Sequence, residues 1–431
     1  MSDDAASLEL LRAPVGTHDL LPGASDRWVA LLGLFANHAH LYGYGLIQTP
    51  LFEDVRLFKR GVGTETEVVG KEMYEFEDRG GRAMALRPEG TASVVRAFLQ
   101  ARPTPPFRAW YAAPIFRYER PQAGRYRQHH QVGIEVLGIS DPDVDVEVLG
   151  LGIDYLTGLG LQGFTLRLNT LGDSACRPQY LEELRAYFHD HAPELCDEHA
   201  AKIDRNPLRI LDCKTESCRA VSVGAPSMLD ALCVDCGTHF ERVKEGLDAR
   251  GIAYFLDQRL VRGLDYYTRT AFEVTLDLGD GELTLLGGGR YDGLVEVLGG
   301  PSTPGIGFGS GIERVLLACD RQGVFAVPPR SPLAYVIDTT DGRAARDLVA
   351  ELRAGGIATE RAYGNRSMKS QFKTADRSGA RFALVVGERE LESGTVTIRD
   401  LRGDGEQLVV LRAEVLSFLS NRTITTPEGS S

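Results

Sequence analysis

The sequence predicts an α+β domain with a mixed, mainly antiparallel sheet flanked by helices, followed by a helical insertion and a smaller C-terminal α/β domain. Two observations favour the first domain: helical periodicity in the first hundred residues, and a strand-loop-strand pattern over about 110–137. The third observation is that strand-like and helix-like segments alternate after residue 332, at the spacing of βαβ units. The length of 431 residues suits about three domains of ordinary size.

Apolar spacing defines the first elements. A helix is expected after Ser25-Asp26, with a stop at Gly43, because apolar residues recur there at intervals of three and four. A short strand over 46–49 follows, and a second helix begins near Pro88-Glu89. The next segments read as an antiparallel hairpin, with strands over 110–113, 115–120 and 130–137 and a loop over 121–127.

A further helix opens at Asp141-Pro142-Asp143 and carries acids at Asp143, Asp145 and Glu147. These could be paired catalytic carboxylates, but first-turn acids that complement a helix dipole are the favoured interpretation.

Residues of about 170–250 look like an inserted, mostly helical unit that holds six of the seven cysteines. Strands resume over 262–286, a glycine-rich turn is expected at 287–289, and a helix is expected to start around 309–311. The predicted organisation is a first domain over 1–325 with that insertion, a linker over 326–332, an α/β domain over 333–420 and a disordered tail over 421–431.

The C-terminal domain is expected to have a largely parallel sheet. Its predicted elements are a strand over 333–337, a helix over 343–352, a strand over 358–361, a helix over 367–378 and a strand over 382–386.

Composition excludes several classes of protein. Hydrophobic residues make up 43% and charged residues 25%, which argues against a largely disordered chain. The net charge of -12 excludes the uniformly basic surface of a non-specific nucleic-acid binder and permits local basic patches. No apolar run reaches the ~18 to 20 residues of a membrane span, and the first residues lack a targeting pattern, so we expect a cytoplasmic protein. The odd number of cysteines suits reduced thiols, and no disulfide is expected.

The hairpin is strongly basic. Between residues 102 and 130 there is one acid, Glu119, and six arginines: Arg102, Arg108, Arg117, Arg120, Arg125 and Arg127. Such a loop suits phosphate oxygens, because guanidinium groups form bidentate, charge-assisted hydrogen bonds. The alternative is a solvated loop with ion pairs to acids elsewhere.

Strand periodicity places Gln131, Gly133 and Glu135 on one face of the return strand, where the glycine would leave space for a pocket floor. Alternatively, Gly133 marks a bulge and Glu135 caps a sheet edge. On the outgoing strand Arg117 and Glu119 are expected to share a face. The glycine runs at 287–289 and 305–311 could cradle a phosphate, although glycine-rich turns are common.

The pattern Cys213-x4-Cys218-x14-Cys233-x2-Cys236 has the spacing of a structural zinc site, and the alternative is four ordinary thiols. A second group, comprising His189, His191, Cys196 and His199, is interpreted as a polar helix surface.

The segments together resemble the class II aminoacyl-tRNA synthetases, and within them the histidyl-tRNA synthetase family closely. The hairpin resembles motif 2, Gly309 to Arg314 resembles motif 3, and Tyr42 to Pro50 resembles motif 1. Two signatures specific to the histidine enzymes are matched by RGLDYY at Arg262 to Tyr267 and by GGRYD at Gly288 to Asp292. The resemblance extends from Pro14 to about residue 420.

The resemblance implies ATP-dependent attachment of histidine to tRNA-His through a histidyl-adenylate, in a homodimer built through motif 1, with Mg2+ accompanying ATP. Arg262 and Arg117 would be catalytic. The implied histidine site comprises Glu89, Thr91, Arg117, Gln131, Glu135, Arg262, Tyr266 and Tyr267, with Tyr291 as a pocket wall. The implied ATP ligands are Arg117, Arg125 and Arg314, and Arg120 and Gln122 would face the acceptor end of the tRNA.

The C-terminal domain resembles the anticodon-binding domain of the family. Arg366, Lys369, Lys373 and Arg377 are spaced three, four and four, which predicts one basic stripe on a helix that could follow tRNA phosphates. An ordinary solvated helix face is the alternative.

A second function from another class is a non-catalytic, synthetase-like regulatory subunit of ATP phosphoribosyltransferase in histidine biosynthesis. Such paralogues generally lack the anticodon-binding domain and have eroded ATP motifs. Here Arg117, Arg262 and Arg314 all stand in place, which favours the synthetase.

Overall fold

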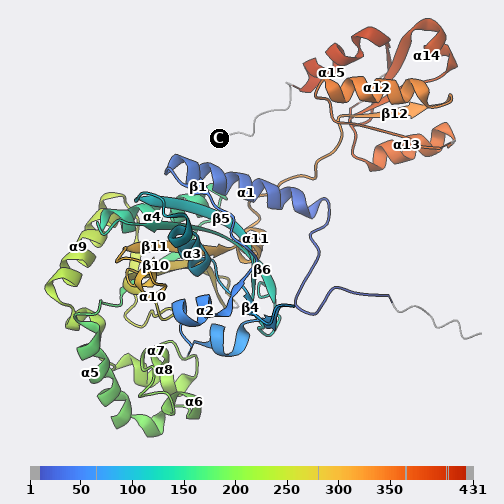
Figure 1. Cartoon of the computed structure of the whole chain (residues 1–431). Coiled ribbons are helices and arrows are strands. Elements are labelled where there is room, and N and C mark those ends of the chain that lie inside the picture. Colours follow the sequence, from blue (N-terminus) through green and yellow to red (C-terminus); the bar gives the residue numbers. More distant parts are fainter. Residues whose placement is uncertain are drawn as a thin grey trace, which may run out of the picture. The chain divides into compact units, whose positions relative to one another are not determined.

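The computed structural model describes residues 10–64, 66–279, 281–364, 366–403, 405 and 407–423. The chain divides into two compact units (Figure 1), and the boundary between Val327 and Pro328 lies inside the segment expected to be a linker. Of the expected disordered tail, residues 421–423 instead end a helix, α15 (Val415–Thr423), and the remainder lies outside the described residues. Among the described helices, none has both the length and the apolarity needed to cross a membrane.

The first unit is built on an eight-stranded mixed sheet with the order β1-β5-β6-β11-β10-β9-β7-β8. In that order the strands are β1 (Gly45–Leu46), β5 (Phe107–Phe116), β6 (Gln128–Leu137), β11 (Gly305–Gly311), β10 (Glu282–Arg290), β9 (Thr268–Asp277), β7 (Thr165–Thr170) and β8 (Tyr254–Leu256). Only the two outermost pairs, β1 with β5 and β7 with β8, are parallel among the paired strands described for this sheet. The prediction of a mainly antiparallel sheet is therefore confirmed.

One face of this sheet packs on α1 (Ala24–Leu41), α4 (Asp143–Gly158), α9 (Val234–Ala249) and α11 (Ile312–Gln322). The core between them contains Phe35 and Tyr155 from the helices and Ile134 from β6. Because side chains alternate along a strand, burial of Ile134 on this face turns its neighbours in β6 toward the other face of the sheet. Helices α2 (Val55–Gly61), α3 (Thr91–Ala101) and α10 (Leu294–Val297) contribute to a second core.

A small antiparallel sheet was not predicted. It has the order β2-β4-β3 and comprises β2 (Phe52–Asp54), β4 (Ala83–Leu86) and β3 (Glu75–Glu77).

The hairpin has the predicted antiparallel pairing, with Tyr111 opposite Gly133 and Ala109 opposite Glu135. Its outgoing strand ends at Phe116, four residues earlier than expected. The N–H of Glu119 turns back to the carbonyl oxygen of Arg117 at 2.8 Å, which breaks the extended conformation. The expectation that Arg117 and Glu119 share a strand face is therefore wrong, because both lie in the connecting loop.

The turn predicted at 287–289 is wrong, because Gly287–Gly289 lie inside β10. Crowding between strands requires glycine there, since a Cβ at Gly288 would overlap the backbone of Gly307. The run 305–311 forms strand β11, and the helix expected around 309–311 begins directly after it, at Ile312. Residues 262–267, expected to be strand, precede β9 as a loop.

The insertion lies between β7 and β8 and is helical, as predicted. Its helices are α5 (Arg177–Asp190), α6 (Asp197–Ala200), α7 (Leu208–Leu211), α8 (Glu216–Val223) and α9 (Val234–Ala249). Helices α5 to α8 gather at one end of the first unit (Figure 1). Tyr180, Leu184 and Cys218 of the insertion belong to the same apolar core as Tyr267, which faces the pocket described below.

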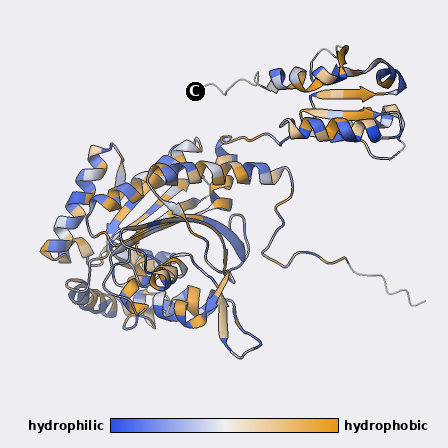
Figure 2. Ribbon diagram, turned by 45° about the horizontal axis from the view of Figure 1, so that its top comes forward, coloured by the Kyte–Doolittle hydropathy of each residue, from blue (hydrophilic) through white to orange (hydrophobic). Residues whose placement is uncertain are grey.

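The second unit has a five-stranded sheet with the order β13-β12-β14-β15-β16, and its strands are largely hydrophobic (Figure 2). Its elements are β12 (Ala334–Asp338), α12 (Arg343–Ala354), β13 (Thr359–Arg361), α13 (Met368–Arg377), β14 (Phe382–Val386), α14 (Glu388–Ser393), β15 (Thr395–Asp400), β16 (Gln407–Leu411) and α15. The first three strands are parallel, as predicted, and the antiparallel pair β15 and β16 was not anticipated.

Candidate active site

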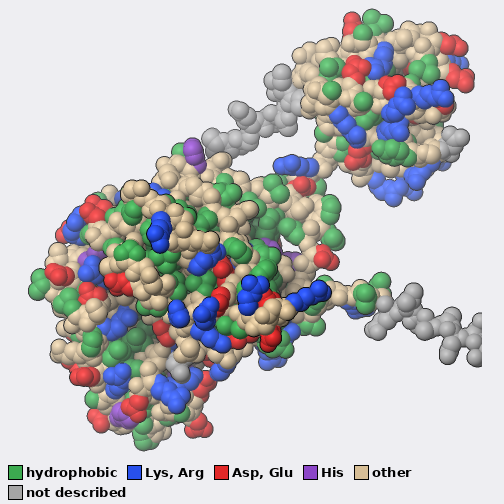
Figure 3. All heavy atoms as spheres, in the orientation of Figure 1, with side chains coloured by type: hydrophobic (Ala, Val, Ile, Leu, Met, Phe, Trp, Pro, Cys, Tyr) green, Lys and Arg blue, Asp and Glu red, His purple; other side chains and the backbone are tan. Residues whose placement is uncertain are grey.

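A pocket of about 1040 Å³ opens on the face of the sheet opposite α1 and α4, and Glu313 and Arg314 at the start of α11 also line it. Its walls come from the central strands, from the hairpin loop, from the loop before β9, and from residues 198–219 of the insertion. Figure 3 shows acidic and basic side chains intermingled on one face of the first unit, which agrees with the absence of a uniformly basic surface there. The pocket gathers segments that lie far apart in the sequence.

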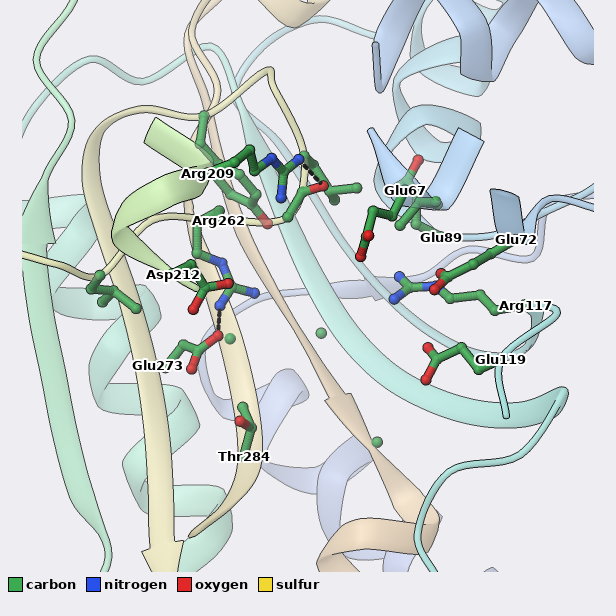
Figure 4. A pocket seen from close by; sticks show the side chains of 18 of the residues that line it. Glu67, Glu72, Glu89, Arg117, Glu119, Arg209, Asp212, Arg262, Glu273 and Thr284 are labelled. Atoms are coloured by element: carbon green, nitrogen blue, oxygen red, sulfur yellow. Dashed lines mark hydrogen bonds and ion pairs between the residues drawn. The ribbon is translucent and has the colours of Figure 1, made fainter. Parts of the chain in front are cut away.

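Arg262 lies on one side of the pocket and Arg117 on the other (Figure 4). The guanidinium of Arg262 forms an ion pair with Glu273 of β9, and its Cζ lies 5.6 Å from the ring centroid of Tyr267. The Nε atom of Arg262 is buried and has no hydrogen-bond partner among the described residues. The side chain thus retains an unused donor.

Arg117 and Arg314 are cations that protein carboxylates do not neutralise directly. Arg117 donates through Nε to the carbonyl oxygen of Pro88 at 2.8 Å, and Arg314 donates to that of Gly124 at 3.1 Å. Neither guanidinium has a carboxylate oxygen within 4 Å in the described part of the chain. Burial lowers the pKa of Arg314, and the positive charges of Arg125 and Arg117 lower it further. Such a site favours an anion.

Other arginines of the hairpin form ion pairs within the protein, as the alternative of a solvated loop predicts, and others remain exposed. Arg108 pairs with Glu147, and Arg125 pairs with Glu119 at 3.6 Å. The guanidinium of Arg127 stacks over Tyr118, with Cζ 3.9 Å from the ring centroid. Two side chains expected to face tRNA, Arg120 and Gln122, are exposed on the loop.

Glu89 is buried at the start of α3, where its carboxylate accepts from the N–H groups of Thr91 and Ala92 at 2.7 and 2.8 Å. The hydroxyl of Tyr266 donates to the same carboxylate at 3.3 Å. Burial raises the pKa of Glu89, and these hydrogen bonds oppose the increase. Glu89, Thr91, Tyr266 and Tyr267 all line the pocket, as does Gln131 of β6.

Glu135 lies beneath this wall and is fully buried. Its two carboxylate oxygens accept from the hydroxyls of Thr91, at 2.6 Å, and Tyr291, at 2.5 Å. Burial raises the pKa of Glu135 to about 8, against the opposing effect of both hydrogen bonds. Tyr291, expected to form a pocket wall, and Glu135, expected to bind histidine, are both buried, and neither lines the pocket.

Tyr111 is a pocket residue that the sequence did not reveal. It stands directly opposite Gly133 in the antiparallel pair, and its ring fills the space above that glycine, since a Cβ there would overlap the phenol. The expectation that Gly133 leaves an empty pocket floor is therefore wrong. The position of a glycine opposite an aromatic residue could have identified Tyr111. That position is known only once the pairing register of the two hairpin strands is known.

The acids of α4 do not line the pocket. Asp145 forms a buried ion pair with Arg290 at 2.7 Å and contacts Nε2 of His239 at 3.1 Å. Asp143, in the first turn with Asp145, pairs with Arg242 at 3.0 Å. These carboxylates bind neighbouring cations and are not a catalytic pair.

The structure does not bring the four cysteines of the predicted zinc site together. Cys213 and Cys218 cluster with Cys196 and His199, whereas Cys233 and Cys236 cluster with Asp173 and Cys176. Within each cluster the candidate ligand atoms lie within 4.8 Å of one another. Cys196 and His199 are therefore part of a thiol cluster, and the interpretation of their group as a polar helix surface is wrong for this pair.

The predicted basic stripe is shortened in the second unit. Helix α13 begins at Met368, so Arg366 precedes it. Lys369, Lys373 and Arg377 are exposed on the helix at intervals of four.

Models of known protein families match most of the chain. Residues 16–315 match the family model of histidyl-tRNA synthetase, and residues 334–422 match that of an anticodon binding domain. The "Histidine--tRNA ligase" of Desulforamulus reducens is 48% identical over 421 residues, which cover 96% of this chain and 100% of the relative. That of Pelotomaculum thermopropionicum is 46% identical and covers 96% and 98%.

Solved structures give the same result. The apo histidyl-tRNA synthetase of S. aureus superposes with a TM-score of 0.81 at 35% identity, over 95% of this chain and 100% of that one. The histidyl-tRNA synthetase of Nostoc sp. shares the fold, with a TM-score of 0.69 at 21% identity over 96% and 100%. With the family model covering more than half of its residues and full-length relatives near 48% identity, the chain belongs to the histidyl-tRNA synthetase family.

Proposed function

We propose that this protein attaches histidine to tRNA-His in an ATP-dependent reaction that passes through histidyl-adenylate. The observation that carries the proposal is that Arg117, Arg262 and Arg314 border the same pocket as Glu89 and a wall of tyrosines. Three cations suit a nucleoside triphosphate, and the buried carboxylate beside them suits an ammonium group.

In the first step, a carboxylate oxygen of histidine attacks the α-phosphorus of ATP, and pyrophosphate leaves. Arg117 and Arg262 approach from opposite sides of the pocket, where they would hold the two reactants and spread the charge of the transition state. In the second step, a ribose hydroxyl of the terminal adenosine attacks the carbonyl carbon, and AMP leaves. The substrates supply both nucleophiles, so the protein contributes positioning and charge stabilisation.

Histidine would bind through two groups of residues. Glu89, Thr91 and Gln131 would take the α-amino group, and Tyr266 would hold Glu89 in place through its hydroxyl. Glu135 and Tyr267 would address the imidazole. The hydrogen bonds from Thr91 and Tyr291 fix Glu135, and each of its oxygens still has a lone pair for a ring N–H. A buried acceptor of this kind disfavours substrates without a matching donor.

ATP would bind through Arg117, Arg125 and Arg314 together with Mg2+. In such sites Mg2+ is held by phosphates and by one or two carboxylates. Glu72 and Asp212 border the pocket and form no ion pair with an arginine in the described part of the chain, so they would be the candidates. Glu119 and Glu273 also border it but are already paired with Arg125 and Arg262.

tRNA-His would contact both units. The exposed Arg120 and Gln122 would face the acceptor end, and Arg366, Lys369, Lys373 and Arg377 of the second unit would contact the anticodon region. The use of tRNA would suit a cytoplasmic protein.

A homodimer through motif 1 is supported by exposed apolar side chains along that region. Leu41 is 80% exposed and Leu46 57% exposed, and Phe52 and Phe76 form an exposed ring pair with centroids 6.2 Å apart. Strand β1, which carries Leu46, is at the edge of the sheet. Sedimentation equilibrium is expected to give twice the mass of the chain, and replacing Leu46 by Asp should shift the population toward monomer.

The decisive experiment is exchange of labelled pyrophosphate into ATP. Exchange that requires histidine, followed by histidylation of tRNA-His, is the expected result. A protein that binds histidine but shows no exchange, beside an active control enzyme, would be the non-catalytic regulatory subunit instead.

A further inference from the structure

Two groups of thiols stand in the insertion outside the proposed chemistry. The cluster that we define as the α6–α8 cluster comprises Cys196, His199, Cys213 and Cys218, and its four candidate ligand atoms lie within 4.8 Å of one another. Tetrahedral zinc with Zn–S bonds of about 2.3 Å and a Zn–N bond of about 2.0 Å needs ligand atoms roughly 3.5–3.8 Å apart. The observed grouping is close to that geometry.

We propose that the α6–α8 cluster is a structural zinc site with three thiolate ligands and one imidazole ligand. Its sequence pattern has two short pairs, Cys196-x2-His199 and Cys213-x4-Cys218, separated by residues 200–212. Structural zinc sites use paired ligands at such spacings, since each short pair forms one half of the tetrahedron.

The surroundings of the sulfur atoms also suit a metal thiolate. The N–H of Cys196 donates to Sγ of Cys218 at 3.2 Å, and the N–H of Thr215 donates to Sγ of Cys213 at 3.4 Å. Backbone N–H groups aimed at sulfur stabilise its negative charge and orient it toward the ion. Sγ of Cys196 lies 3.1 Å from Nδ1 of His199, so these two ligand atoms are already adjacent.

Two of the four ligands are buried, and the other two, Cys196 and His199, are half-buried. Cys218 is fully buried and Cys213 is 8% exposed, among the buried side chains of Leu195, Ile203 and Ile210. The thiols are not paired as disulfides among the described cysteines. Four ligands would leave no position open for water, so the ion would stabilise the fold and take no part in the chemistry.

The second cluster is a weaker site. Its only non-sulfur member, Asp173, already forms an ion pair with Arg269 at 3.2 Å and accepts from the N–H of Ala175 at 3.0 Å. A neighbouring guanidinium repels a divalent cation. We therefore assign zinc to the α6–α8 cluster and use Cys233, from the second cluster, as the matched control.

The position of the site gives it a consequence for the pocket. Residues 198–219 form one wall of the pocket, and both His199 and Cys213 border it. Arg209 and Asp212, which lie between the two ligand pairs, face the pocket as well (Figure 4). Zinc would hold this wall, which has only the short helices α6, α7 and α8, in a fixed conformation.

The test is the metal content of the full-length protein, purified under reducing conditions without a chelator and measured by mass spectrometry. We expect about one zinc per chain. Replacement of Cys196 or Cys213 by Ser should reduce it to background, and Cys233→Ser should leave it unchanged. Absence of zinc, or loss of zinc in Cys233→Ser with retention in Cys196→Ser, would overturn the proposal.

A second measurement uses the unsubstituted protein, so it tests the proposal even if the variants fail to fold. X-ray absorption at the zinc edge should give three sulfur ligands and one imidazole, because the α6–α8 cluster contains a histidine and the second cluster does not. A fourth ligand that is a carboxylate oxygen would place the ion in the second cluster, and thiol analysis that finds a Cys213–Cys218 disulfide would contradict the site altogether.

Discussion

The hydroxyl of Tyr291 donates to Oε2 of Glu135 across 2.5 Å, and both side chains are buried and lie outside the lining of the pocket. Thr91 donates to the other oxygen of the same carboxylate. Despite these bonds, burial raises the pKa of Glu135 to about 8, so the folded protein holds a proton there that the unfolded chain releases near pH 4.5.

This difference predicts a pH-dependent stability. Between about pH 4.5 and 8 the folded state binds more protons at Glu135 than the unfolded state, so its contribution to the free energy of unfolding falls as the pH rises, by up to about 1.4 kcal/mol per pH unit. Glu135→Gln removes the titration. Relative to the unsubstituted protein, the variant should gain stability from pH 5 to 8 and no more above pH 8, as measured by urea unfolding.

The exposed Glu182→Gln variant is the control and should follow the curve of the unsubstituted protein. If the stability of Glu135→Gln depends on pH in the same way as that of the unsubstituted protein, the carboxylate titrates at its usual pH in the folded protein.

A substitution at Gly288 of β10 tests how closely the central strands pack. A Cβ at this position would overlap the backbone of Gly307 and Phe308, and backbone in the middle of a sheet cannot move aside. We expect Gly288→Ala to lower the free energy of unfolding by about 3 kcal/mol. Gly237→Ala, in α9 with no atom within 4 Å of the added Cβ, should raise it by about 0.5–1 kcal/mol. Equal effects at the two sites would contradict the crowding argument.

The glycines of β10 show which features of the fold local sequence patterns do not predict. The helices after residues 25, 88 and 141 were predicted because local apolar periodicity specifies them, and so was the antiparallel hairpin. Residues 287–289 were expected to be a turn, because the need for glycine there arises from a strand that follows almost twenty residues later. Local spacing carries no information about such contacts.

The candidate site was likewise predicted only in part from the sequence. Motif resemblance selected Glu89, Arg117 and Arg262, which the structure brings to one pocket. It did not select Tyr111, whose role depends on the register of the hairpin. Spacing along the chain grouped Cys213 and Cys218 with Cys233 and Cys236, whereas the fold places them beside Cys196 and His199.

Breaking the buried ion pair between Arg290 and Asp145, which does not line the pocket, should cause a large loss of stability. Both side chains are fully buried, and Arg290 also donates to the carbonyl oxygens of Ile139 and Asp141 at 3.1 Å. Arg290→Met would leave the Asp145 charge without its guanidinium partner, which should lower the free energy of unfolding by about 3–5 kcal/mol. Thermal and urea unfolding measure the loss.

The matched control is Arg242→Met, because Arg242 is half-exposed and pairs with Asp141 and Asp143 at the surface. Its cost should stay below about 1 kcal/mol. Similar costs for the two variants would mean that water reaches the buried pair. Replacing Asp145 by Leu in the Arg290→Met background should recover part of the loss.

Arg262 is predicted to act in adenylate formation. Arg262→Gln should lower the rate of histidine-dependent pyrophosphate exchange by about 100- to 1000-fold, because the cation that faces the reacting phosphate is removed. Arg79→Gln, an exposed position outside the pocket, should leave the rate unchanged.

The ion pair with Glu273 provides a second control. The loss could also come from the negative charge that Arg262→Gln leaves unpaired. The double variant Arg262→Gln with Glu273→Gln separates the two causes. We expect it to stay as slow as the single variant, and recovery of exchange would mean that Arg262 serves only to neutralise Glu273.

The exposed cations of α13 should contribute to tRNA affinity through phosphate contacts. Replacing Lys369, Lys373 and Arg377 by Gln should weaken tRNA binding and reduce the slope of log affinity against log salt concentration by about 3, since each phosphate contact releases roughly one counterion. Histidine-dependent pyrophosphate exchange should be unchanged, because every residue that lines the pocket belongs to the first unit.

A comparison with α12 decides between phosphate contacts and an ordinary solvated face. Helix α12 packs on the face of the sheet opposite α13, and its Arg343 and Arg346 are also exposed. Changing Arg343 and Arg346 to Gln, or Lys369 and Lys373 alone, removes two positive charges from the same unit in either variant. If the two variants reduce the salt slope equally, only net charge matters and α13 is a solvated face. A reduction confined to the α13 variant would mean that the tRNA backbone approaches the face that carries α13, because attraction is screened within about 10 Å at 0.1 M salt.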